Sequence, residues 1–129
     1  MCMIDAGETY KVSRSAIRTA RTQHKCGECS RVIAKGETYR YCTGLYDDYW
    51  NVHKTCRHCD VARAWLSKNC GGWLYESVYD DIREHASEYP ALAFGINRIV
   101  VGMRRGWQRR DGQGLMPVPG MPRSIASVM

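Results

Sequence analysis

The sequence predicts an α+β fold, and three features support this. Two cysteine pairs of the form C-x2-C, at Cys26–Cys29 and Cys56–Cys59, are separated by 26 residues. The residues between the pairs are rich in β-forming side chains, and after the second pair the apolar residues take up a helical period. A chain of 129 residues is long enough for one domain with a modest core.

The two cysteine pairs predict a metal site. Thiolates at this spacing can turn toward one ion, and two such pairs form the tetrahedral four-sulfur shell that a structural zinc ion prefers. The alternative is disulfides or free thiols, which the odd number of seven cysteines and the lack of a secretory signal disfavour. We therefore expect one structural Zn²⁺ with a closed shell, held by Cys26, Cys29, Cys56 and Cys59.

The segment before Cys59 predicts short strands. A strand is expected at 9–13, and residues 15–21 are expected to form a helical turn or a basic arm. Between the cysteine pairs we expect a hairpin, with strands at 31–33, 38–43 and 49–53 and turns at 34–37 and 44–48.

Helices are predicted after Cys59. The apolar residues Val61, Ala62, Trp65 and Leu66 share one face of a first helix, which would carry the last ligands in its first turn. A second helix is expected over 73–89, and a third from Pro90 with an apolar face made of Leu92, Ile96, Ile99, Val100, Met103 and Trp107.

A cysteine knuckle, a hairpin and a ligand-bearing helix, in that order, form the treble-clef arrangement. We therefore expect a single zinc-binding domain over residues 1–110. It would comprise a zinc module at about 20–70 and a helical extension at 71–110. The Gly/Pro-rich segment 111–129 is expected to be a flexible tail.

The charge distribution predicts an acidic partner. The net charge is +6, and residues 91–129 carry six arginines against one acidic residue. Such a segment suits nucleic acid or an acidic protein face. No apolar run is long enough to span a membrane, so we expect a cytoplasmic protein with no membrane partner.

Several motifs resemble a group of small, mostly uncharacterised phage and prophage zinc-finger proteins. They are H-K-C-G-E-C-S-R-V-I-A-K-G-E-T-Y, T-G-L-Y-D-D-Y-W, K-T-C-R-H-C and C-G-G-W-L-Y-E-S-V-Y-D-D-I, within roughly residues 20–85. The resemblance implies the same four cysteine ligands and, for a phage protein, the cytosol of a bacterial host. It implies no activity.

A second likeness offers another ligand set. Trp50-x2-His53-x2-Cys56 resembles the end of a poly(ADP-ribose)-polymerase-type or LIM-type finger, in which His53 would replace Cys59. We favour Cys59, because a helix-borne C-x2-C pair presents both sulfurs to one ion without bending the preceding strand.

Three functions are compatible with these features. The first is a non-enzymatic phage-type interaction protein that binds and modulates a host protein, and the alternative is a nucleic-acid-binding zinc finger that uses basic N-terminal and C-terminal segments. A metal-dependent nuclease is disfavoured, because the helix after Cys59 holds no histidine and His58, between two ligands, should point away. The residues predicted to contact a partner are Tyr46, Trp50, Arg98, Arg105 and Arg109.

Overall fold

A computed structural model describes residues 12–46, 49–70 and 76–125 of the chain. Its architecture is mixed α+β, so the predicted fold class is confirmed. The elements follow in the order β1 (Val12–Thr19), β2 (His24–Lys25), β3 (Val32–Ile33), β4 (Thr38–Tyr46), β5 (Tyr49–Cys56), α1 (Arg57–Cys70), α2 (Val78–Glu88), a 3-10 turn η2 (Pro90–Leu92) and α3 (Ala93–Arg104).

The strands form two small antiparallel sheets. One has the order β1-β4-β5 and the other pairs β2 with β3. The prediction of a helical turn or arm at residues 15–21 is wrong, because Ser15 to Thr19 pair with β4 in register from Cys42 to Thr38. The residues with which this strand pairs lie 19 to 27 positions away in the chain, so local sequence does not reveal the pairing. The predicted turn at 44–48 is also shorter, because β4 continues to Tyr46 before residues 47–48, which lie outside the described part.

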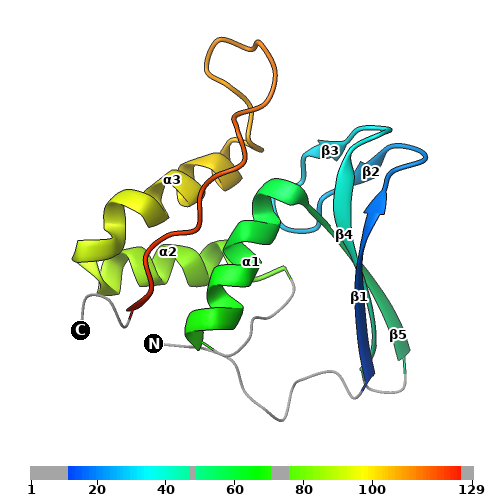
Figure 1. Cartoon of the computed structure of the whole chain (residues 1–129), viewed down its shortest axis with the longest axis horizontal. Helices are drawn as coiled ribbons and strands as arrows, with labels where there is room; N and C mark the ends of the chain where they lie inside the picture. The colour runs from blue at the N-terminus through cyan, green and yellow to red at the C-terminus, as the bar shows by residue number, and fades with distance from the viewer. Residues whose placement is uncertain (1–11, 47–48, 71–75, 126–129) are drawn as a thin grey trace.

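Helices α2 and α3 lie on the other side of α1 from the larger sheet (Figure 1). On α1 the predicted face is buried at Ala62, Trp65 and Leu66. The six residues predicted to form the apolar face of the third helix are all buried: Leu92, Ile96, Ile99, Val100, Met103 and Trp107. The helix is shorter than predicted, because Leu92 belongs to η2 and Trp107 to a turn after α3. The second helix begins at Val78 in the structure, and residues 71–75 of its predicted range lie outside the described part.

Residues 111–125 differ from the flexible tail that the sequence predicts. The segment runs back along α1 (Figure 1) and is held by hydrogen bonds at both ends. The Met116 N–H donates to the Trp107 carbonyl over 2.7 Å, the Trp65 indole N–H to the Arg123 carbonyl over 2.9 Å, and the Ile125 N–H to Asn69 Oδ1 over 2.8 Å. Its glycines and prolines prevent regular structure, but side chains of α1 supply partners for its backbone.

Candidate metal centre

The first cysteine pair sits in a tight turn that is tied to β5. The Cys26 N–H donates to the Arg31 carbonyl over 2.9 Å, and the Ser30 N–H donates to the Cys26 carbonyl over 3.0 Å. Ser30 takes the left-handed conformation with φ of 67°, which closes the turn. The Gly27 N–H donates to the Lys54 carbonyl over 2.8 Å and holds the turn beside the end of β5.

The second pair spans the junction of β5 and α1. Cys56 is the last residue of β5, and Cys59 lies in the first turn of α1, where the sequence analysis expected the last ligands. The positive end of a helix dipole stabilises thiolates at this position. The Cys59 N–H also donates to Cys56 Sγ over 3.4 Å.

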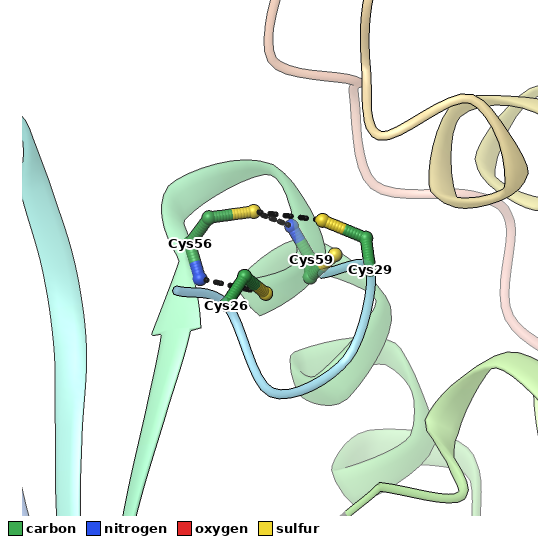
Figure 2. A group of neighbouring side chains, drawn as sticks. All are labelled: Cys26, Cys29, Cys56 and Cys59. Atoms are coloured by element: carbon green, nitrogen blue, oxygen red, sulfur yellow. Dashed lines mark hydrogen bonds between the residues drawn. The ribbon is translucent and has the colours of Figure 1, made fainter. Parts of the chain in front are cut away.

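The structure brings all four predicted cysteines together (Figure 2). Their sulfur atoms lie within 4.8 Å of one another, and Cys29 Sγ and Cys56 Sγ are 3.8 Å apart. A tetrahedral ion with metal–sulfur bonds of about 2.3 Å separates its ligands by about 3.8 Å, whereas a disulfide joins its sulfurs at about 2.0 Å. The cluster is therefore compatible with a metal ion, and its cysteines are free thiols.

Four thiols at these distances cannot all ionise without a cation. Hydrogen bonds from the neighbouring thiols, that of Cys26 first, hold the pKa of the Cys56 thiol low. The interaction with Cys26 raises the pKa of the Cys29 and Cys59 thiols. A bound divalent cation would remove this conflict, since it favours the thiolate at every position.

N–H groups around the cluster point at its sulfurs. Cys26 Sγ accepts from the Glu28 and Cys56 backbone N–H groups at 3.4 and 3.3 Å. Cys59 Sγ accepts from the indole N–H of the fully buried Trp107 at 3.2 Å. Such donors stabilise negative charge on ligating sulfurs.

From the sequence, Trp107 is predicted only as an apolar residue on a helix face. The contact with Cys59 depends on a turn after α3 in which Gly106 and Trp107 both have a φ of 60°. It also depends on Gly102, where a Cβ would overlap the Trp107 ring. Gly102, in the last turn of α3, is the local sequence feature that could have indicated this contact.

A buried polar chain runs beside the cluster. Arg31 makes two hydrogen bonds to the Glu37 carboxylate at 2.9 and 3.1 Å and lies 3.3 Å from His58 Nδ1. Burial disfavours the charged form of Arg31, but the hydrogen bonds and charges of Glu37 and Cys56 together outweigh it, and the pKa of the guanidinium is raised. His58 Nε2 lies 2.6 Å from the Met116 carbonyl oxygen. Because a guanidinium only donates and a carbonyl only accepts, Nδ1 accepts and Nε2–H donates.

Glu28 connects the first knuckle to α2. Its carboxylate accepts from the Glu76 N–H at 2.9 Å and the Val78 N–H at 3.3 Å, where α2 begins. Burial raises the pKa of the Glu28 carboxyl, and the two N–H donors oppose this rise. The helix N-cap residue, Ser77, makes no side-chain capping bond, so Glu28 accepts the first N–H of α2, that of Val78, from 50 residues away.

The other candidate ligands lie outside the cluster. His53 is in β5 opposite Cys42, and neither belongs to the group of sulfurs. Burial lowers the pKa of His53. His58 points at Arg31 and Met116, as its place between two ligands predicts. Within the described residues, the four cysteines are the only group of three or more side chains able to hold one ion.

The predicted partner-binding residues do not form one surface. Trp50 on β5 is 64% exposed, and the side chain of Tyr46 lies outside the described part. Arg98, Arg105 and Arg109 are all exposed. Trp50 lies on β5 and Arg98 on α3, and α1 lies between the larger sheet and α3 in Figure 1.

Comparison with known proteins adds no relative. No family model, no curated protein and no solved structure matches the chain. In the described part of the chain, none of the helices has the length and apolar character needed to cross a membrane.

Proposed function

We propose that this protein is a zinc-stabilised, non-enzymatic interaction protein of the bacterial cytosol. The observation that carries the proposal is the four-sulfur cluster. It joins the first knuckle to the start of α1 in the order typical of a treble clef. Four thiolates match the preference of Zn²⁺ for soft ligands in tetrahedral geometry.

The zinc would be structural rather than catalytic. Catalytic zinc keeps an open position for water, whereas four cysteines fill the tetrahedron. The nearby His58 is engaged on both ring nitrogens, so it is not free to hold a second ion or to act as a base. These features argue against hydrolysis at the cluster.

The partner we propose first is an acidic host protein, which the chain would bind and modulate. The supporting feature is an exposed stripe on α3, made of Phe94, Arg98, Val101 and Arg105, with spacings of four, three and four residues. Phe94 is 96% exposed and Val101 is 40% exposed. Aromatic and arginine side chains dominate the energetics of protein interfaces.

Nucleic acid is the second candidate, because a basic surface also lies on the larger sheet. Arg14 and Arg18 on β1 are exposed, and no acid pairs with either of them in the described part of the chain. Phosphate groups are the commonest ligands of such surfaces.

The metal proposal is tested by native mass spectrometry and thermal melting. We expect one zinc ion per chain. Cys56→Ser or a strong chelator should release it and abolish the cooperative transition, because zinc binding supplies much of the folding free energy. Cys42→Ser, a buried cysteine outside the cluster, should keep the ion. A metal-free chain that melts cooperatively at the same temperature would refute the proposal.

The partner proposal is tested by capture from a nuclease-treated bacterial lysate. We expect a host protein to be retained by the tagged wild-type chain and lost with the double variant Phe94→Ala, Arg98→Ala. Trp50→Ala, on the sheet side of α1, is the matched control and should retain it. Capture that disappears with nuclease treatment would point to nucleic acid instead.

A further inference from the structure

One face of the β1-β4-β5 sheet is exposed on β1 and on the first half of β5, and it is buried at the end where the paired residues Tyr39 and Cys56 join the core. Directly paired residues of antiparallel strands point to the same side. The register pairs Ala16 and Lys54 with Tyr41, Arg14 and Val52 with Thr43, and Trp50 with Leu45. We call this side the open sheet face, and its residues used below are Arg14, Arg18, Tyr41, Trp50, Val52 and Lys54.

The opposite side of the sheet faces α1. Arg40, the neighbour of Tyr41 on β4, points to that side, and its Nε–H donates to Asp60 Oδ1 of α1 over 2.9 Å. Helix α1 runs beside β4 on this side in Figure 1. On the open face Trp50 is 64% exposed and Val52 51%.

The open sheet face is basic. The described residues between 12 and 56 include eight Lys or Arg residues and only two acids, Glu28 and Glu37. Both acids are engaged elsewhere, Glu28 at the start of α2 and Glu37 with Arg31. The basic residues of the open face are Arg14, Arg18 and Lys54, and none of them belongs to an ion pair in the described part of the chain.

Aromatic groups alternate with these cations. The Arg18 guanidinium lies 3.7 Å from the centre of the Tyr41 ring, a cation–π contact that holds it flat against the sheet. Lys54 Nζ is 3.2 Å from His24 Nδ1, and the His24 ring packs on Tyr39 at 5.2 Å. A hollow of about 820 Å³ lined by Arg18, Arg21, His24 and Tyr39 borders this end of the face. Trp50 stands at the other end.

We propose that the open sheet face binds single-stranded nucleic acid, with phosphates at Arg14, Arg18 and Lys54 and a base stacked on Trp50. The inference rests on the nucleic-acid candidate named above and assigns it a site. Sheets that combine basic side chains with exposed aromatic rings suit unpaired bases, whose π-faces are free. A duplex hides those faces, and carboxylates or lipid headgroups offer charge without a ring to stack.

The stacking half is tested with the zinc-loaded full chain and a fluorescein-labelled 15-nucleotide oligo-dT, by fluorescence anisotropy. Trp50→Ala should weaken binding roughly tenfold, the effect of losing one stacked base. The control is Tyr49→Ala, because Tyr49 adjoins Trp50, is 74% exposed and points to the other side of the strand. It should change the Kd by less than about twofold. Equal effects of the two variants would overturn the proposal.

The phosphate half is tested by the salt dependence of the same binding. Each phosphate contact to a single strand contributes about 0.7 to the slope of log K against log salt. Arg14→Gln with Arg18→Gln should therefore lower the slope by about 1.4. Arg98→Gln with Arg105→Gln on α3 removes equal charge and should leave the slope unchanged. A slope reduced equally by both pairs would contradict the proposed site.

Competitors distinguish this ligand from other acidic ones. We expect a duplex of the same length, poly-glutamate and vesicles rich in phosphatidylserine to compete at least tenfold less well than unlabelled oligo-dT. If any of them competes as well as oligo-dT, the open sheet face recognises negative charge alone and the proposal is wrong. Zinc binding and capture of a host protein through α3 are tested separately, so they are unaffected by that result. Each variant must keep its zinc and its melting temperature, which separates surface effects from unfolding.

Discussion

The indole of Trp107 contributes its hydrogen-bond donor to the metal cluster. Its N–H lies 3.2 Å from Cys59 Sγ, inside the core. Trp107→Phe keeps most of the packed ring volume and removes this donor. We expect zinc affinity to fall about tenfold, the usual cost of losing a partner of a metal ligand, as measured by competition with a chromophoric chelator.

Trp65→Phe is the matched control for this prediction. Trp65 is also fully buried on the helical side, but its indole N–H donates to the Arg123 carbonyl rather than to sulfur. Its loss should cost about 1 kcal/mol of stability and leave zinc affinity unchanged. If both variants lower zinc affinity alike, the Trp107–Cys59 contact has no specific effect on the metal.

Gly102 makes room for Trp107. An alanine in a helix interior normally stabilises it by about 1 kcal/mol relative to glycine. At Gly102 the added Cβ would overlap the buried Trp107 ring. The overlap should cost more than the gain in helix propensity, so Gly102→Ala should lower the free energy of unfolding by about 2–3 kcal/mol in denaturant titration.

Gly95 on the same helix supplies the comparison. A Cβ there would lie 3.7 Å from Pro122 Cβ, an ordinary contact. Gly95→Ala should therefore be neutral or stabilising by up to about 1 kcal/mol. Equal destabilisation at both glycines would indicate a general intolerance of α3 rather than a clash with Trp107.

At the residue scale, the sequence could predict which cysteines come together but not what surrounds them. C-x2-C spacing constrains the sulfurs directly, whatever the rest of the chain does. The Trp107 donor lies 48 residues from Cys59, and the capping Glu28 lies 50 residues from Val78, so only tertiary packing defines these contacts. Their residue types gave no local indication of either role.

Among the elements, α2 contains a buried acid that opposes folding. Asp81 is 6% exposed, its Oδ1 has no hydrogen-bond partner in the described part of the chain, and burial raises the pKa of its carboxyl. A raised pKa in the folded state means that the ionised carboxylate costs stability at neutral pH. That cost disappears as the pH falls below the ordinary value of an aspartate.

Asp81→Asn should therefore raise the melting temperature at pH 7, and the difference from wild type should shrink as the pH approaches 4. Asp80→Asn controls for the loss of an acid in the first turn of α2, because Asp80 is exposed. Melting curves of both variants across this pH range give the comparison. A gain at pH 7 that matches that of Asp80→Asn would show that burial of Asp81 is not its cause.

Elements with a strong period could be predicted, and those that depend on a distant partner could not. The apolar faces of α1 and α3 follow from helical spacing alone. β1 reads equally well as a helical turn because its residues have no strong preference, and pairing with β4 decides the outcome. Glycine and proline indicate a lack of regular structure in 111–125, but composition does not say whether such a segment docks.

For the whole molecule, the C-terminal segment closes the core over α1. Removing residues 111–129 would remove three hydrogen bonds to the rest of the chain: Trp65 Nε1–H to the Arg123 carbonyl, His58 Nε2–H to the Met116 carbonyl, and the Ile125 N–H to Asn69 Oδ1. At about 1 kcal/mol for each hydrogen bond, the truncation should cost about 3 kcal/mol. A denaturant titration of the full-length and truncated chains measures this difference.

Because the Trp107 indole lies beside Cys59, its fluorescence can report metal binding. Cobalt in place of zinc forms thiolate complexes that absorb in the near ultraviolet, where tryptophan emits. The fluorescence of Trp107 should therefore be quenched as cobalt binds, while that of the exposed Trp50 should be quenched less. A cobalt titration followed by tryptophan emission would then measure the occupancy of the four-cysteine cluster without an attached dye.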